Sequence, residues 1–147
     1  MDIRVFPQVL FKSWLCRVVP DKYRNNNSLA LMLKEIDTGE PIATATINMV
    51  DDGAQGLINQ YYDYEHIPVY IKDYSENQGM LVALQEAGVV SDVVDYYYSG
   101  YVRVPLVIVT NQQIINWYGC FIKTSLTPII VEDETLTLQD EVMIPGV

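Results

Sequence analysis

The chain is short of the residues on which most enzymes and metal proteins depend. It has two cysteines, Cys16 and Cys120, and one histidine, His66, among 147 residues. Two cysteines are too few for a disulfide framework or a cysteine metal site, so we expect two buried thiols. The sequence also has no phosphate-binding loop and no nucleophile paired with a base. It therefore predicts no catalytic residue, no metal, no cofactor and no enzymatic activity.

Basic residues are also scarce. Nine lysines and arginines stand against 19 aspartates and glutamates, which gives a formal net charge of −10 and a pI near 4.3. Such a surface repels phosphates, so we expect no direct binding to nucleic acid or to an anionic membrane, and we expect basic proteins as partners. Residues 1–20 are apolar but contain Pro7, Lys12 and Arg17, so they match neither a signal peptide nor a membrane span. We expect a cytoplasmic protein.

The chain has ample apolar residues for a core. Half of its residues are hydrophobic, and 147 residues suit one compact domain covering 1–147. Strands are predicted over residues 9–19, 29–36 and 42–49, the last two forming a hairpin. Gly39 supplies a positive φ in the turn, and Pro41 starts the second strand. Asp37-Thr-Gly in this turn is also the local signature of aspartic proteases, but it occurs once and between two glutamates, so the turn interpretation is favoured.

Residues 51–68 show no sustained period and predict a long loop. His66 lies there beside Asp63 and Glu65, which is either a fragment of a metal or general-base site or, as we favour, an exposed loop histidine. A short strand over residues 69–72 follows.

A helix over residues 76–87 is then predicted from two overlapping capping boxes, Asp73 with Glu76 and Ser75 with Gln78. Its buried stripe would consist of Met80, Leu84 and Ala87, with Leu81 adjacent. Gly88 would form the left-handed C-terminal cap, and Gly79 within the first turns suggests that another group packs closely against it.

Two further strands are predicted over residues 93–98 and 101–109, with Pro105 on an edge or at a bulge. Alternation places Tyr96 and Tyr98 on one face and Tyr97 on the other. One face would pack against the helix, and the other is either a half-exposed aromatic surface or a recognition surface. Residues 110–147 are expected to add two strands, with residues 114–121 covering the core. The fold class is therefore α+β: an antiparallel sheet of about five to seven strands with one main helix packed on one face.

Tyrosine is concentrated in one acidic part of the chain. Nine of the eleven tyrosines fall in residues 61–101, together with seven carboxylates and one base, Lys72. Aromatic residues combined with charge of one sign suit a surface that binds a partner.

Three runs carry a resemblance. They are Asp37-Thr-Gly-Glu-Pro-Ile-Ala-Thr-Ala-Thr-Ile-Asn, Ile71-Lys-Asp-Tyr-Ser-Glu-Asn-Gln-Gly-Met-Leu-Val-Ala-Leu-Gln-Glu-Ala-Gly-Val-Val and Ser99-Gly-Tyr-Val-Arg-Val-Pro-Leu. The chain resembles small uncharacterised proteins carried by phages and conjugative elements of gut bacteria, over residues 29–109, and the Lys-Asp-Tyr-Ser-Glu-Asn block is the most specific part. The resemblance transfers no catalytic residue. Residues 51–68 look longer and richer in tyrosine than in that family, and residues 110–147 look like a C-terminal extension.

This setting implies a counter-defence protein of the anti-CRISPR type. It would act in the cytoplasm of a bacterial host, where an acidic surface would occupy the groove of a basic nuclease that binds nucleic acid. The alternative is a structural or assembly subunit of a phage particle or transfer apparatus, in which the tyrosines and residues 110–147 form homo-oligomer interfaces. The residues expected to bind the partner are Tyr61, Tyr62, Asp63, Tyr64, Glu65, Asp95, Tyr96 and Tyr98.

Overall fold

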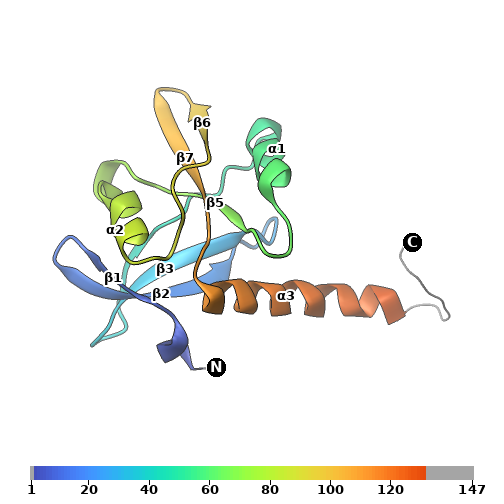
Figure 1. The fold of residues 1–147 in the computed structure, drawn as a ribbon, viewed down its shortest axis with the longest axis horizontal. Coiled ribbons are helices and arrows are strands. Elements are labelled where there is room, and N and C mark those ends of the chain that lie inside the picture. The colour runs from blue at the N-terminus through green and yellow to red at the C-terminus, as the bar shows by residue number, and fades with distance from the viewer. Residues whose placement is uncertain (1, 132–147) are drawn as a thin grey trace. The chain divides into compact units, whose positions relative to one another are not determined.

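The computed structural model of the protein describes residues 2–131, and the side chains of residues 2–122. The chain divides into two compact units, residues 1–116 and residues 117–147. The α+β class is confirmed, but the first unit contains two antiparallel sheets, of four and three strands, in place of the single sheet expected (Figure 1). Among residues 2–131, three α-helices, and not one main helix, accompany them.

The first sheet has the order β1-β2-β3-β4, with β1 at Gln8–Phe11, β2 at Trp14–Lys22, β3 at Leu29–Glu35 and β4 at Pro41–Thr44. The expectation of one strand over residues 9–19 is wrong, because the chain reverses at Lys12-Ser13 to form a β1–β2 hairpin. Lys12 adopts a positive φ of 57°, and its ammonium donates to the backbone oxygen of Glu76 at 2.8 Å. A long-range contact thus fixes a turn that has no glycine, asparagine or proline.

The β3–β4 hairpin is confirmed. The two strands pair antiparallel, Gly39 has a φ of 75°, and Pro41 is the first residue of β4. The second strand is shorter than expected, because the chain leaves the ladder after Thr44 and forms only an isolated bridge between Thr46 and Ile71.

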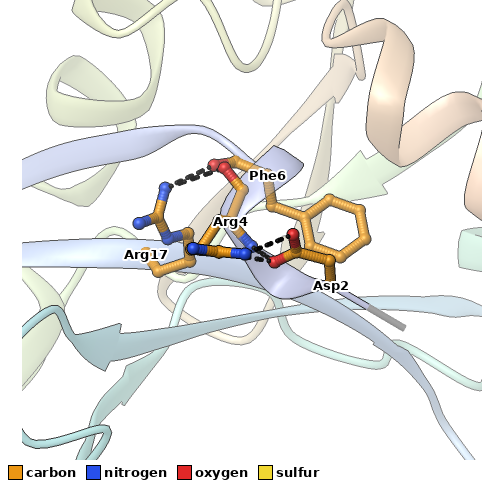
Figure 2. A network of polar contacts seen from close by, with 4 residues as sticks. All are labelled: Asp2, Arg4, Phe6 and Arg17. Carbon is orange, nitrogen blue, oxygen red and sulfur yellow. Dashed lines mark hydrogen bonds and ion pairs between the residues drawn. The ribbon is translucent and has the colours of Figure 1, made fainter.

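A short 3-10 turn, η1 at Ile3–Val5, precedes the first sheet and is fastened to it by the side chain of Arg17 (Figure 2). The Arg4 guanidinium donates to both carboxylate oxygens of Asp2 at 3.0 Å. Arg17 of β2 donates through Nη1 to the backbone oxygen of Phe6 at 2.9 Å and to that of Arg4 at 3.3 Å. The bonds from Arg17 satisfy carbonyl groups of the 3-10 turn and attach the turn to the second strand.

The second sheet has the order β5-β7-β6, with β5 at Pro68–Tyr70, β6 at Asp95–Ser99 and β7 at Val102–Ile108. Pro105 was expected at an edge or a bulge, yet it lies in the central strand. The position tolerates proline because the pairing with β5 ends at Tyr70 opposite Leu106, so Pro105 lies just beyond the last residue paired with β5, while it pairs with Tyr96 of β6 on the other side. Its carbonyl still accepts from the Ile71 amide at 3.0 Å.

The helix α1, at Asp52–Tyr61, replaces most of the loop expected over residues 51–68. Ala54, Leu57, Ile58 and Tyr61 recur at the spacing of one helical face and pack together with buried Leu106 of β7. Burial of this face offsets the cost of the two glycines in the helix, Gly53 and Gly56.

The helix α2, at Met80–Glu86, is shorter than the predicted helix over residues 76–87. The capping-box residues form a separate 3-10 turn, η2 at Ser75–Asn77, and Gly79 is the left-handed residue before α2, with nothing within 4 Å of an added Cβ. The close packing expected there is therefore wrong.

Other details of this helix region agree with the sequence. Asp73 still caps α2, because its carboxylate accepts from the Leu81 amide at 2.9 Å. Gly88 adopts the left-handed φ expected, and Met80 and Leu84 are buried, whereas Ala87 is exposed.

The helix α3, at Gln112–Val131, lies where two further strands were expected. It crosses the boundary between the two compact units, and the part of the expectation that falls on residues 132–147 lies outside the described residues. Within the described part of the chain, no helix combines the length and the apolar character required to cross a bilayer.

Candidate partner-binding surface

Three tyrosine hydroxyls fasten α1 to the second sheet. Tyr70 of β5 donates to the Ala54 backbone oxygen at 2.7 Å, and Tyr97 of β6 donates to the Asp51 carboxylate at the start of the helix. At the other end, the hydroxyl of Tyr61 donates to Asp95 of β6 at 3.1 Å.

These bonds also perturb the phenols. Burial raises the pKa of Tyr70 to about 12, and the carboxylate partners raise the pKa values of Tyr97 and Tyr61. Part of the tyrosine cluster is therefore structural, because it orients α1 along β6. The sequence signal for this role was the helical spacing of residues 54, 57, 58 and 61, which aligns Tyr61 with the buried face.

A tight turn follows α1 and presents an exposed part of the tyrosine-rich segment. Asp63 closes it: one carboxylate oxygen accepts from the amides of Glu65 and His66 at 2.7 and 2.8 Å. The His66 imidazole lies 2.8 Å from the same carboxylate. The Glu65 amide, followed by the imidazole, lowers the pKa of Asp63. Tyr64 at the tip of this turn is 80% exposed.

The structure brings together most of the residues expected to bind a partner. Tyr61 and Asp95 are joined by a hydrogen bond, and the turn with Tyr62, Asp63, Tyr64 and Glu65 begins directly after Tyr61. We call these six residues the acidic tyrosine surface. Its four turn residues are exposed, while Tyr61 and Asp95 are half-buried.

Tyr96 and Tyr98 do not belong to this surface. They alternate with Asp95 and Tyr97 along β6 and therefore point to the opposite face of the second sheet, as the sequence predicted for these tyrosines. Tyr96 lies under the Arg103 guanidinium, 4.1 Å from the ring centroid, and Tyr98 is largely exposed. A partner that contacts the turn after α1 therefore approaches the face of β6 that carries Asp95, and not the face that carries Tyr96 and Tyr98.

Charge is segregated along the first unit. Residues 2–35 contain six bases and three acids, whereas residues 36–110 contain two bases and eleven acids. Both bases of the second segment are engaged, since Lys72 pairs with Glu76 at 2.5 Å and Arg103 covers Tyr96. This ion pair lowers the pKa of Glu76 to about 2. The carboxylates at the turn after α1 therefore meet no lysine or arginine from their own segment.

No cluster for metal binding is found in the part of the chain that the structure describes. No group of three or more histidine, cysteine, aspartate or glutamate side chains there is arranged to hold an ion. His66 is exposed in its turn and lies against Asp63 alone among the potential metal ligands. Cys16 is buried as expected, and burial raises the pKa of its thiol, but Cys120 is exposed, so the expectation of two buried thiols is wrong for one of them.

A second exposed patch lies on the β1–β2 hairpin. Leu10 and Leu15 are directly opposite one another in the ladder and are 63% and 48% exposed. Leu10 is in β1, an edge of the first sheet, and Leu15 is in the neighbouring strand β2. Exposed apolar side chains at the edge of a sheet are a common feature of protein contact sites.

Comparisons with known proteins add nothing to this geometry: no family model, no curated protein and no solved structure matches the chain. The resemblance to proteins of phages and conjugative elements therefore stays a prediction from the sequence.

Proposed function

We propose that the protein is a stoichiometric binding protein and not an enzyme. It acts by laying the acidic tyrosine surface into a groove through which a basic partner binds nucleic acid. In the biological setting suggested by the sequence, it is a counter-defence protein of a phage or mobile element, and the partner is a host nuclease of the kind inhibited by anti-CRISPR proteins.

The observation that carries this proposal is the exposed turn after α1. Tyr64 and Tyr62 offer aromatic contact area at low entropic cost, and Asp63 and Glu65 offer carboxylates. Asp63 is held by two backbone amides, so the turn is ordered before it meets a partner. A rigid acidic loop flanked by aromatic rings matches a lysine- and arginine-rich groove in charge.

Removing the two charges of the turn tests this proposal while the structure of the turn is kept. Asp63→Asn and Glu65→Gln keep the shape of both side chains and remove two charges. The matched control, Asp37→Asn with Glu40→Gln, removes two charges from the β3–β4 turn on the other sheet. Tagged wild type and both double variants are used for pull-downs from bacterial host lysate at low and high salt, with mass spectrometry of the bound proteins.

The expected result is one basic nucleic-acid-binding protein that is retained at low salt and released at high salt. The turn variant should bind the purified partner roughly tenfold more weakly at low salt, which corresponds to about 1.4 kcal/mol. The control variant should bind like wild type. Equal weakening by both variants would show that net charge matters and the turn does not. Retention that is independent of salt and of both variants would overturn the electrostatic mechanism.

The exposed Leu10–Leu15 pair favours a second candidate, a structural or assembly subunit of a phage particle or transfer apparatus. In that case the hairpin would be an interface between subunits, and acidity would serve solubility. Size-exclusion chromatography with light scattering separates the two candidates. A monomer or dimer supports the inhibitor, and a ring or large assembly that Leu10→Ser dissolves supports the structural role.

A further inference from the structure

A cleft of about 390 Å³ runs beside β4, in the first compact unit and away from the acidic tyrosine surface. Its volume lies in the range of ligand-binding clefts. Its wall combines apolar side chains with hydroxyl, amide, ammonium and carboxylate groups, and the lining residues are Tyr23, Ile42, Ala43, Thr44, Thr46, Ile47, Asn48, Lys72, Glu76 and Asn77.

The cleft is elongated along the chain. Six of the seven consecutive positions 42–48 line it, and β4, which contributes the first three of them, is an edge strand. An extended backbone of seven residues spans roughly 23 Å. A wall of this kind favours an extended occupant over a compact one.

Asn77 contributes a buried side-chain amide to the lining of the cleft. Asn77 is the last residue of η2, and it is only 2% exposed. Its amide nitrogen donates to the backbone oxygen of Thr44 at 2.7 Å, which fixes the orientation of the amide. Among the described residues, no donor reaches the amide oxygen of Asn77. A buried carbonyl without a donor is costly, and a ligand N–H group would remove that cost.

Tyr23 and Thr46 place a donor in the cleft. Their hydroxyl oxygens are 2.8 Å apart, and the Thr46 oxygen also accepts from the Leu31 amide at 3.2 Å. The two hydroxyls carry two hydrogens, and only one of them joins the pair. Within the described part of the chain, the second hydrogen has no acceptor. Thr46 is only 3% exposed whereas Tyr23 is half-buried, so when Thr46 donates to Tyr23 the Tyr23 hydroxyl offers one O–H donor to a ligand.

We propose that this cleft binds an extended peptide segment of another protein. A peptide N–H group donates to the Asn77 amide oxygen, and a peptide carbonyl accepts from the Tyr23–Thr46 pair. Asn77 is anchored at Thr44, two residues from Thr46 along an extended stretch, which corresponds to about 7 Å. An extended peptide presents backbone groups on one side at the same interval of two residues. Lys72 and Glu76 also line the cleft, where they form an ion pair with each other and add polar groups beside the side chains of the peptide.

The test begins with a random heptapeptide library, from which peptides that bind the immobilised full chain are selected. The enriched sequence is synthesised with an acetylated N-terminus and an amidated C-terminus, so that only backbone and side-chain groups can bind. Its affinity is measured by calorimetry for wild type, for Tyr23→Phe, and for the Asp63→Asn, Glu65→Gln variant, which controls for binding at the acidic tyrosine surface. A second series carries a single N-methyl group at each position in turn.

If the cleft binds backbone groups, one N-methyl position should lower affinity at least tenfold while its immediate neighbours are tolerated. Tyr23→Phe should lower it roughly five- to tenfold, and the turn variant should bind like wild type. Failure to enrich any peptide overturns the proposal. So does tolerance of N-methylation at every position, or an affinity that falls with the turn variant and not with Tyr23→Phe. Tyr23→Phe removes one hydroxyl, and its thermal unfolding is recorded beside each titration to establish that the variant is folded.

Discussion

Replacing Tyr70 with phenylalanine removes one oxygen atom and tests how α1 is held to the second sheet. The hydroxyl donates to the Ala54 backbone oxygen at 2.7 Å, and both residues are buried. The substitution removes this bond, while the carbonyl keeps its place in the α1 hydrogen-bond ladder and the edge-to-face contact of ring 70 with Tyr97 is kept. Loss of one buried hydrogen bond costs about 0.5–1.5 kcal/mol, so the midpoint of thermal unfolding should fall by roughly 2–6 °C.

Urea unfolding and amide hydrogen exchange measure this effect. The unfolding free energy should fall by the stated amount, and the loss of protection should be largest in α1. The control is Tyr98→Phe, because Tyr98 is largely exposed and its substitution should change the free energy by less than about 0.5 kcal/mol. A Tyr70→Phe protein as stable as wild type, with unchanged protection in α1, would refute the view that this hydroxyl positions the helix.

Tyr70 also predicts that the folded protein loses stability at alkaline pH. The pKa of Tyr70 is raised in the folded state from 10 to about 12, so the folded protein keeps a proton that the unfolded chain releases. The resulting stabilisation is complete below pH 10 and is lost as the pH rises toward 12. The difference in stability between wild type and Tyr70→Phe should therefore shrink over that interval, and a constant difference would contradict the assignment.

Two further predictions concern the same region. Gly56→Ala should stabilise α1 by about 0.5–1 kcal/mol in urea unfolding, because an added Cβ meets nothing within 4 Å, whereas Gly53→Ala should gain less, because its Cβ would lie 3.3 Å from the Tyr97 ring. Equal gains would show that the ring yields freely. The Asp63 carboxyl should titrate below its ordinary value of 3.8 by NMR, so its contribution to stability is present above that pH and is lost as the pH falls through the lowered pKa. In His66→Ala its pKa should remain low, because the Glu65 amide is the larger cause; a return to 3.8 would assign the shift to the imidazole.

Local signals were sufficient where the chain turns on its own residues. The β3–β4 hairpin follows from Gly39 and Pro41, whose backbone preferences hold in any context. The left-handed cap at Gly88 follows for the same reason. The β1–β2 turn could not be predicted in this way, because Lys12 is held in its unusual conformation by a carbonyl 64 residues away.

The candidate surface was predictable in composition and only partly in arrangement. Tyr62, Asp63, Tyr64 and Glu65 follow directly from the density of tyrosine and carboxylate in the sequence. The helix before them was missed because two glycines obscured its regular apolar spacing. Packing against the second sheet stabilises this helix. The division of β6 into two faces was predictable from alternation, but which face lies beside the turn depended on the position of α1.

The segregation of charge along the first unit gives the molecule a directional approach. The basic segment, residues 2–35, includes β1, β2 and β3 of the first sheet. Within the first unit, this sheet lies on the opposite side from α1 and β6 (Figure 1). In the field of a strongly basic protein the first unit experiences a torque as well as an attraction, which favours an approach with its acidic side first. Orientation before contact raises the fraction of collisions that are productive, and it does so only while the Debye length, about 10 Å at 0.1 M salt, remains comparable to the separation of the two surfaces. A net charge spread evenly over the same residues would attract the partner without selecting the end that meets it.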